Sequence, residues 1–143
     1  MKAVLYVLVL LAFAFSCKTS KTNTDKTSTG NTVENDTVRI ANDDLEYEII
    51  IIDPGFNTWL ETMARPRGFH SQQYMEARNI LFVTEWNQRV LQPQRFDPRL
   101  YELQIDYRQG IDYGYEVNYK LYNYFIYFQL KYKQQLSNFV PRI

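Results

Sequence analysis

Few side chains in this sequence could carry out nucleophilic or metal-dependent chemistry. The 143 residues include one histidine, His70, and one cysteine, Cys17. A Ser/His/Asp-type triad would need His70, which we interpret first as a surface or capping residue before a helix. A zinc site built from several cysteines or histidines is excluded. The sequence also has no Gly-rich phosphate loop, GxSxG or HExxH motif, so we expect no metal and no cofactor.

Paired carboxylates are a second possible source of chemistry, because two of them about 5–10 Å apart can hydrolyse glycosides. The candidates lie near expected turns or on a solvated helix face: Asp53, Glu85, Asp97 and Asp112. Local roles explain each of them, and Glu85 is placed to pair with Arg89. An alternative function therefore remains open, a small glycan-binding or hydrolytic protein that uses Asp53 and Asp97 with the Arg65/Arg67 loop.

Arginines gather in two connections that contain proline: Arg65, Arg67, Arg95 and Arg99. If the two connections approach each other, they form a basic rim that could hold a carboxylate or a phosphate. The simpler interpretation is that these are solvated loop charges, balanced by Asp97 and Glu61. We name Arg65, Arg67, His70 and Arg95 as possible ligand or partner contacts.

Tyrosine is concentrated late in the chain, with nine of the twelve between Tyr101 and Tyr132. Some must belong to a core, but Tyr127 falls on the expected polar side of a helix, between Asn123 and Lys131. Amphipathic aromatic surface is typical of protein interfaces and sugar-binding platforms. We name Tyr124 and Tyr127 as possible contacts of a partner protein or a glycan; the alternative, an aromatic-rich core, is the simpler interpretation.

Hydrophobic periodicity predicts the elements that position these residues. They are a strand over about 45–53, helices over 56–64 and 71–91, a strand over about 100–107 and a helix over 114–135. The isoleucines at 49–52 predict a first strand covered on both faces. Residues 111–117 alternate, and a third strand there is the alternative. We also expect the tail over 137–143 to dock on the domain.

The predicted fold class is α+β, a small antiparallel sheet covered by three helices in the order β-α-α-β-α. Residues 45–143 form its single domain. Residues 17–44 are rich in Thr, Ser, Asn, Lys and Asp, which predicts a disordered tether, although Val38 and Ile40 could begin the folded part. The sequence has 16 basic and 16 acidic residues, and this balance argues against nucleic acid as a partner.

Residues 1–16 have the pattern of an export signal. The uncharged run at 3–15 follows a basic start and is too short to span a bilayer, which needs about 20 apolar residues. The sequence Ala14-Phe15-Ser16-Cys17 resembles the lipobox of bacterial lipoproteins, although Ala14 and Phe15 depart from its usual residues. We predict that Cys17 carries lipid; ordinary signal cleavage, leaving a free Cys17, is the alternative.

Four stretches resemble an uncharacterised family of short lipoproteins from Bacteroidota. They are Glu46–Phe56, Arg65–Phe69, Gln94–Pro98 and Leu136–Arg142, and the resemblance covers nearly all of 45–143. It implies placement in the cell envelope and no known activity. Surface-exported lipoproteins of that lineage usually carry acidic residues after the lipidated cysteine, whereas Lys18–Lys21 follow here, which favours a periplasm-facing protein.

The predicted function is therefore a lipid-anchored envelope protein without enzymatic activity. Its expected partners are the membrane, through Cys17, and another envelope protein, through the aromatic helix and the basic connections.

Overall fold

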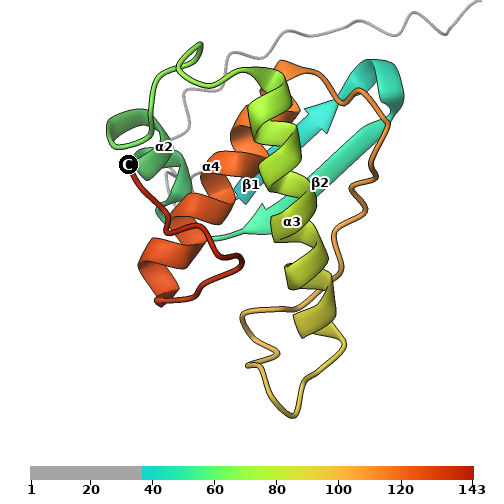
Figure 1. The fold of residues 1–143 in the computed structure, drawn as a ribbon, viewed down its shortest axis with the longest axis vertical. Helices are drawn as coiled ribbons and strands as arrows, with labels where there is room; N and C mark the ends of the chain where they lie inside the picture. Colours follow the sequence, from blue (N-terminus) through green and yellow to red (C-terminus); the bar gives the residue numbers. More distant parts are fainter. Residues whose placement is uncertain (1–36) are drawn as a thin grey trace, which may run out of the picture.

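The computed structural model of the protein describes residues 37–143. Its elements are β1 (Thr37–Asn42), the 3-10 helix η1 (Asp43–Leu45), β2 (Tyr47–Ile52), α2 (Phe56–Thr62), α3 (Gln72–Val90) and α4 (Tyr115–Tyr132). The α+β class, with a two-stranded antiparallel sheet and three helices, is confirmed (Figure 1). The predicted signal peptide, Cys17 and the first part of the tether lie outside the described residues. Within 37–143, no helix is both long enough and apolar enough to cross a membrane.

The folded part begins earlier than composition predicted, because residues 37–44 form β1 and η1 rather than the end of a tether. β1 pairs with β2 in register from Thr37 opposite Ile52 to Asn42 opposite Tyr47. Asn42 closes the turn, since its side chain accepts hydrogen bonds from the amides of Asp44 and Leu45 at 3.0 and 3.3 Å. One fully buried residue, Ile40, fixes this polar strand to the core.

The strand predicted over 100–107 was wrong, and β1 takes its place beside β2. The alternation of apolar and polar residues in that segment does not carry over to burial, because Tyr101 and Ile105 are buried whereas Leu103 between them is 77% exposed. Hydrogen bonds from side chains of α3, rather than from a neighbouring strand, hold this segment. Trp86 Nε1 donates to the Leu103 carbonyl at 2.9 Å, and the Asn87 side chain bonds both the N–H and the C=O group of Ile105. Two buried side chains and these hydrogen bonds to α3 thus hold the segment without strand pairing.

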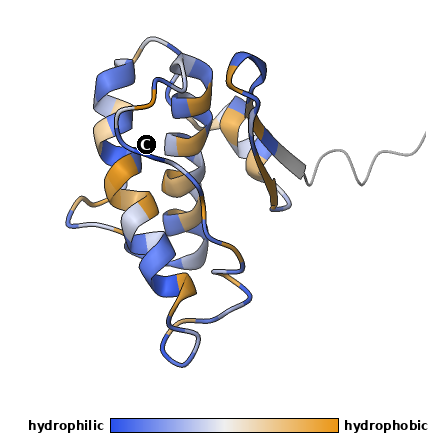
Figure 2. Ribbon diagram, turned by 90° about the vertical axis from the view of Figure 1, so that its right-hand side faces the viewer, coloured by the Kyte–Doolittle hydropathy of each residue, from blue (hydrophilic) through white to orange (hydrophobic). Residues whose placement is uncertain are grey.

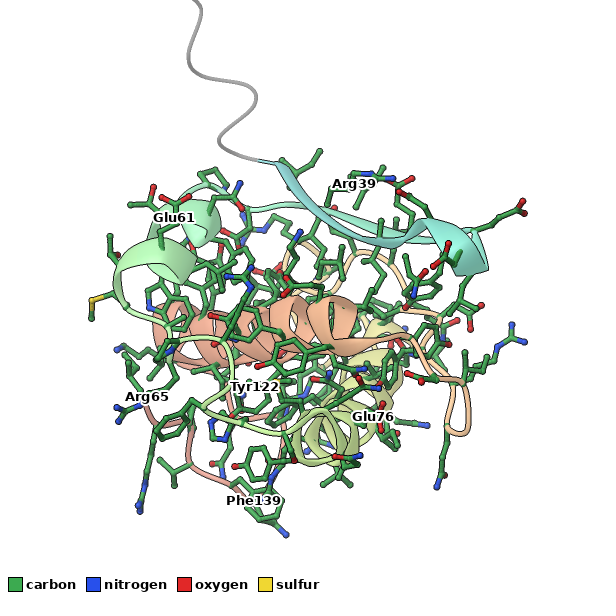
Figure 3. All side chains as sticks on the ribbon, turned by 90° about the horizontal axis from the view of Figure 1, so that it is seen from above. Arg39, Glu61, Arg65, Glu76, Tyr122 and Phe139 are labelled. Atoms are coloured by element: carbon green, nitrogen blue, oxygen red, sulfur yellow. The ribbon has the colours of Figure 1, made fainter. Side chains whose placement is uncertain are left out.

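β2 is covered on one face only, contrary to the prediction from its isoleucine run. Ile49 and Ile51 are half-buried, whereas Ile50 is 61% and Ile52 77% exposed. Only the last four residues of β2, Ile49–Ile52, form a hydrophobic run, and the hairpin lies at one edge of the molecule (Figure 2). Arg39 of β1 pairs with Ile50 of β2, and its side chain also lies on the outward face of the hairpin (Figure 3).

Helix α4 is the centre of the domain. Residues 121–129 are all buried, because the hairpin, α2 and α3 surround the helix (Figures 1 and 3). The predicted helices over 71–91 and 114–135 are confirmed, including the N-cap at Ser71, whose Oγ accepts from the Tyr74 amide at 3.2 Å. The alternative strand over 111–117 does not form.

The role of β1 can be tested by replacing Ile40 with alanine. Removal of this fully buried side chain should lower the free energy of unfolding by about 2–5 kcal/mol. Ile50→Ala in β2 is the matched control and should cost less than about 1 kcal/mol, since that side chain is mostly exposed. Urea denaturation measures both, and equal losses would contradict the assignment of β1 to the core.

Candidate functional site

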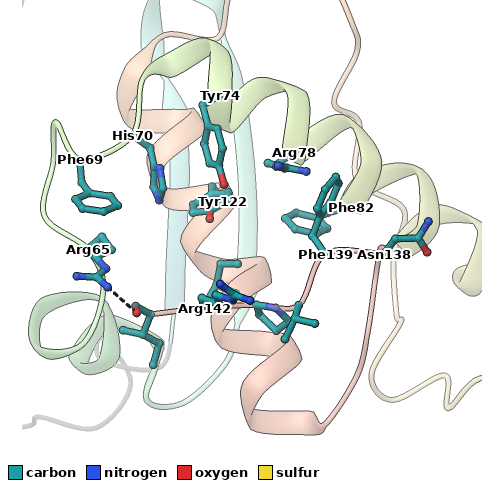
Figure 4. A pocket seen from close by; sticks show the side chains of 14 residues that line it. Arg65, Phe69, His70, Tyr74, Arg78, Phe82, Tyr122, Asn138, Phe139 and Arg142 are labelled. Carbon is teal, nitrogen blue, oxygen red and sulfur yellow. Dashed lines mark hydrogen bonds between the residues drawn. The ribbon is translucent and has the colours of Figure 1, made fainter.

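A groove of about 500 Å³ lies between the start of α3, the middle of α4 and the C-terminal segment (Figure 4). It is lined by aromatic and basic side chains, Phe69, His70, Tyr74, Phe82, Tyr122 and Phe139 with Arg65, Arg78 and Arg142, and by Ile126, Asn138, Val140, Pro141 and Ile143. This arginine groove contains two of the predicted contact residues, Arg65 and His70. The expected docking of the tail is confirmed, since residues 138–143 form one wall.

Local sequence explains how the opposite wall is built. Ser71 begins α3, so Tyr74 and Arg78 lie one turn apart on the same face of that helix. His70, just before the cap, stacks on Tyr74 with ring centroids 4.4 Å apart and meets the edge of Tyr122 at 5.3 Å. The imidazole is therefore a packed part of the wall.

The groove concentrates arginines that form no ion pair with an aspartate or glutamate of residues 37–143. Five arginines of the described chain form ion pairs: Arg39, Arg67, Arg89, Arg99 and Arg108. Of the four others in residues 37–143, Arg65, Arg78 and Arg142 line the groove, and only Arg95 lies outside it. No aspartate or glutamate lines the groove. No carboxylate side chain of its own wall therefore compensates its positive charge.

Aromatic rings and the tail hold two of these guanidinium groups. Arg65 lies 4.9 Å from the Phe69 ring centroid, and its Nη2 donates to the main-chain oxygen of Ile143 at 2.8 Å. Arg78 lies over the ring of Phe139 at 3.3 Å and near that of Tyr74 at 5.1 Å. These contacts orient the charges and leave their remaining N–H donors for a ligand.

Burial lowers the pKa of His70, and the positive charge of Arg65 lowers it further. His70 is therefore neutral at pH 7, since even its ordinary pKa is about 6.5. The positive charge of the groove at that pH comes from arginine, which stays protonated throughout the physiological range.

The basic rim predicted from two approaching connections does not form. The connections before and after α3 lie at opposite ends of this helix, whose 19 residues span about 28 Å (Figure 1). Arg67 is bound by both carboxylate oxygens of Glu116, at 2.7 and 3.0 Å. Arg95 lies over the ring of Phe96 at 5.3 Å, outside the groove. Of the predicted contacts, only Arg65 and His70 come together.

Tyr124 and Tyr127 belong to the core, so the prediction that they contact a partner is corrected. They are 3% and 6% exposed. The polar side of α4 is covered by α2, and the rings of Phe56 and Trp59 lie 5.4 and 5.6 Å from Tyr127. Burial raises the pKa of Tyr127, whose hydroxyl donates to the Pro54 carbonyl at 2.8 Å. The alternative of an aromatic-rich core is the one that the structure shows.

Asp53 is held in a buried ion pair. It is 4% exposed, and Lys131 Nζ lies 2.6 Å from its Oδ1. The Lys131 ammonium also donates to the Pro54 carbonyl and to the Tyr127 hydroxyl, at 2.9 and 2.8 Å. Burial opposes the charged form of Lys131, but its side-chain interactions with Asp53, Tyr127 and Tyr132 prevail and raise its pKa. The group therefore links the β2–α2 turn to α4.

The other candidate carboxylates also have local partners. Arg99 donates two hydrogen bonds to Asp97, and they lower the pKa of that carboxyl. Glu85 pairs with Arg89 at 2.7 Å, as predicted, and Asp112 accepts from Gln72 at 2.6 Å. The part of the chain that the structure describes has no group of three His, Cys, Asp or Glu residues able to hold a metal ion.

Sequence reasoning missed Arg78, Arg142, Tyr74 and Tyr122 as lining residues of the groove. Arg78 and Tyr74 share a helix face with His70, and that spacing was the available signal. Nothing in the sequence indicated that the tail packs beside the same face.

Residues 5–141 match the family of unknown function DUF6146. No curated protein and no solved structure matches the chain.

The buried ion pair can be tested with Lys131→Met. The change leaves the Asp53 carboxylate buried without its cation, so the free energy of unfolding should fall by roughly 2–4 kcal/mol. This value is below that for a fully buried pair, because the Lys131 side chain is 34% exposed and solvent screens its charge. Lys133→Met alters an exposed lysine two residues away and serves as the control, with little expected change. Thermal and urea unfolding report both values, and similar values for the two variants would disprove a stabilising role for the pair.

Proposed function

The chain belongs to the DUF6146 family, and we propose that it is a lipid-anchored, non-enzymatic protein of the bacterial cell envelope that binds an acidic segment of a partner protein in the arginine groove. The observation that carries this proposal is the convergence of Arg65, Arg78 and Arg142 on a groove that no aspartate or glutamate lines. Charge-assisted hydrogen bonds from arginine to carboxylate are among the strongest that proteins make, so an acidic ligand is the natural complement.

The apolar rim of the groove favours a protein over a glycan. Phe69, Phe139 and Val140 are 56%, 44% and 68% exposed beside the arginines. Exposed aromatic residues and arginine are the composition of protein-binding surfaces.

The chemistry of the lining supports binding rather than catalysis. The guanidinium groups remain protonated, and the one side chain with an ordinary pKa near neutrality, His70, is packed against Tyr74. The alternative of a hydrolase built on Asp53, Asp97 and the Arg65/Arg67 loop is less well supported. Asp53 is engaged by Lys131 and Asp97 by Arg99, while Arg67 is engaged by Glu116.

Placement in the envelope rests on the sequence. The export signal and the lipobox-like residues before Cys17 support lipid attachment, and Lys18–Lys21 support a periplasm-facing protein. Two or more acyl chains on one residue hold a protein firmly to a membrane.

Binding can be measured by isothermal titration of the full-length protein with the peptide acetyl-Glu-Phe-Asp-Leu-Glu-amide. The double variant Arg78→Glu, Arg142→Glu should weaken binding at least about tenfold, because two charge-assisted contacts become repulsive. Arg95→Glu is the matched control, since Arg95 is unpaired and outside the groove, and should bind like the wild type. Equal loss in the control, or tighter binding of a polyuronate than of the peptide, would overturn the proposal.

The anchor is tested separately with Cys17→Ala in the native host. Metabolic labelling with an alkyne fatty acid should label the wild type and not the variant, and the variant should leave the membrane fraction. An unlabelled wild type would support ordinary signal cleavage instead.

A further inference from the structure

The three arginines that line the arginine groove belong to three separate segments of the chain. Arg65 lies in the connection between α2 and α3, Arg78 lies on α3, and Arg142 lies on the tail, residues 137–143 (Figure 4). A ligand that contacts Arg78 and Arg142 together would therefore connect the tail to a packed helix.

The tail begins at a fixed point. Leu136 is 2% exposed, and its amide donates to Gln129 Oε1 at 2.8 Å. Ser137 Oγ then accepts from the Phe139 amide at 3.1 Å, a contact within the tail itself. The tail is thus held firmly at its start by the core, whatever its later residues do.

Few contacts hold the rest of the tail. No residue of 137–143 is buried, and Val140 is 68% exposed. Within the described chain, the one hydrogen bond between a main-chain group of 138–143 and a residue outside the tail joins Ile143 to Arg65, at 2.8 Å. The guanidinium of Arg78 lies over the Phe139 ring at 3.3 Å. One hydrogen bond and one cation–π contact therefore carry most of the docking.

These contacts do not offset the entropy that the tail loses when it docks. Ordering the backbone of one residue costs about as much as one exposed hydrogen bond or cation–π contact returns. Six residues follow Ser137, and their apolar side chains remain largely in water, so two contacts cannot balance the cost. The docked tail is consequently the part of the groove that opens most easily.

Charge opposes docking in the protein alone and favours it around an acidic ligand. No aspartate or glutamate lines the groove, so Arg142 on the tail meets the like charges of Arg65 and Arg78 on the facing side. A carboxylate between Arg142 and Arg78 would attract both and accept charge-assisted hydrogen bonds from both. The ligand would thereby supply the binding energy that the tail lacks.

We propose that the tail is a strap that closes on the acidic segment bound in the arginine groove, with a carboxylate of the ligand bridging Arg142 and Arg78. The inference rests on the proposed function, because it requires an acidic ligand at this site. Closure and binding are linked, so each favours the other by the same factor.

The strap is tested by NMR relaxation of the full-length protein with and without acetyl-Glu-Phe-Asp-Leu-Glu-amide. The order parameters of the Phe139, Val140 and Arg142 amides should rise from below about 0.6, the flexible range, to about 0.85, the value of rigid backbone. The matched peptide acetyl-Gln-Phe-Asn-Leu-Gln-amide has no side-chain carboxylate and should leave them unchanged.

Isothermal titration of the same samples separates the two proposals. If the acidic peptide does not bind, the proposed function and the strap both fail. If it binds in the groove and the order parameters of the tail do not change, the strap alone is overturned.

Arg142→Glu tests closure without any ligand. A carboxylate on the tail itself can pair with Arg78 or Arg65, so the order parameters of Phe139 and Val140 should rise in the protein alone, and the acidic peptide should add no further increase. Arg95→Glu makes the same change of charge outside the groove and should leave the tail as in the wild type. A tail that is equally mobile in Arg142→Glu and the wild type, or already rigid in the wild type, would contradict the strap.

Discussion

The fold depends on one constraint, the enclosure of α4. A helix presents successive residues about 100° apart, so the continuous burial of residues 121–129 requires cover on every side. No single neighbour can provide it. The hairpin, α2, α3 and the tail each cover part of the circumference, and a small domain consequently needs nearly all of its other elements to bury one helix (Figure 3).

Because α4 is enclosed, its buried polar side chains must find hydrogen-bond partners inside the domain. Asn123 Nδ2 donates to the Tyr119 carbonyl at 2.8 Å, and Gln129 Nε2 to the Phe125 carbonyl at 3.0 Å, so both side chains are satisfied inside the core. Gln129 additionally accepts from the Leu136 amide at 2.8 Å, which fixes the chain after the helix. Polar residues here anchor neighbouring segments and do not mark a solvent face.

The enclosure of α4 by distant segments explains which predictions from the sequence succeeded and which did not. The α+β class, α3 with its Ser71 cap and the span of α4 follow from local periodicity and capping, and they are confirmed. The exposure of Tyr127 was mispredicted because its cover comes from α2, distant in sequence. β1 was missed because it follows directly on residues rich in Thr, Ser, Asn, Lys and Asp, and the choice between β1 and 100–107 as the partner of β2 depends on tertiary packing.

The arginine groove could be predicted only in part, because it too is built from segments that are distant in the sequence. Arg65 and His70 were identified from one connection, but the tail that completes the groove lies more than sixty residues away. Its approach depends on Leu136, which is 2% exposed and fixes the start of the tail against the core.

The two walls of the arginine groove differ in rigidity, and this affects ligand selectivity. Arg78 is fixed on a long helix, whereas the facing wall is a segment without regular structure, tied through Ile143 to Arg65 and through Phe139 to Arg78. Segments of this kind shift at lower cost than packed helices. A ligand in the groove would therefore meet a charge in a fixed position on the α3 side and a wall of adjustable position on the tail side.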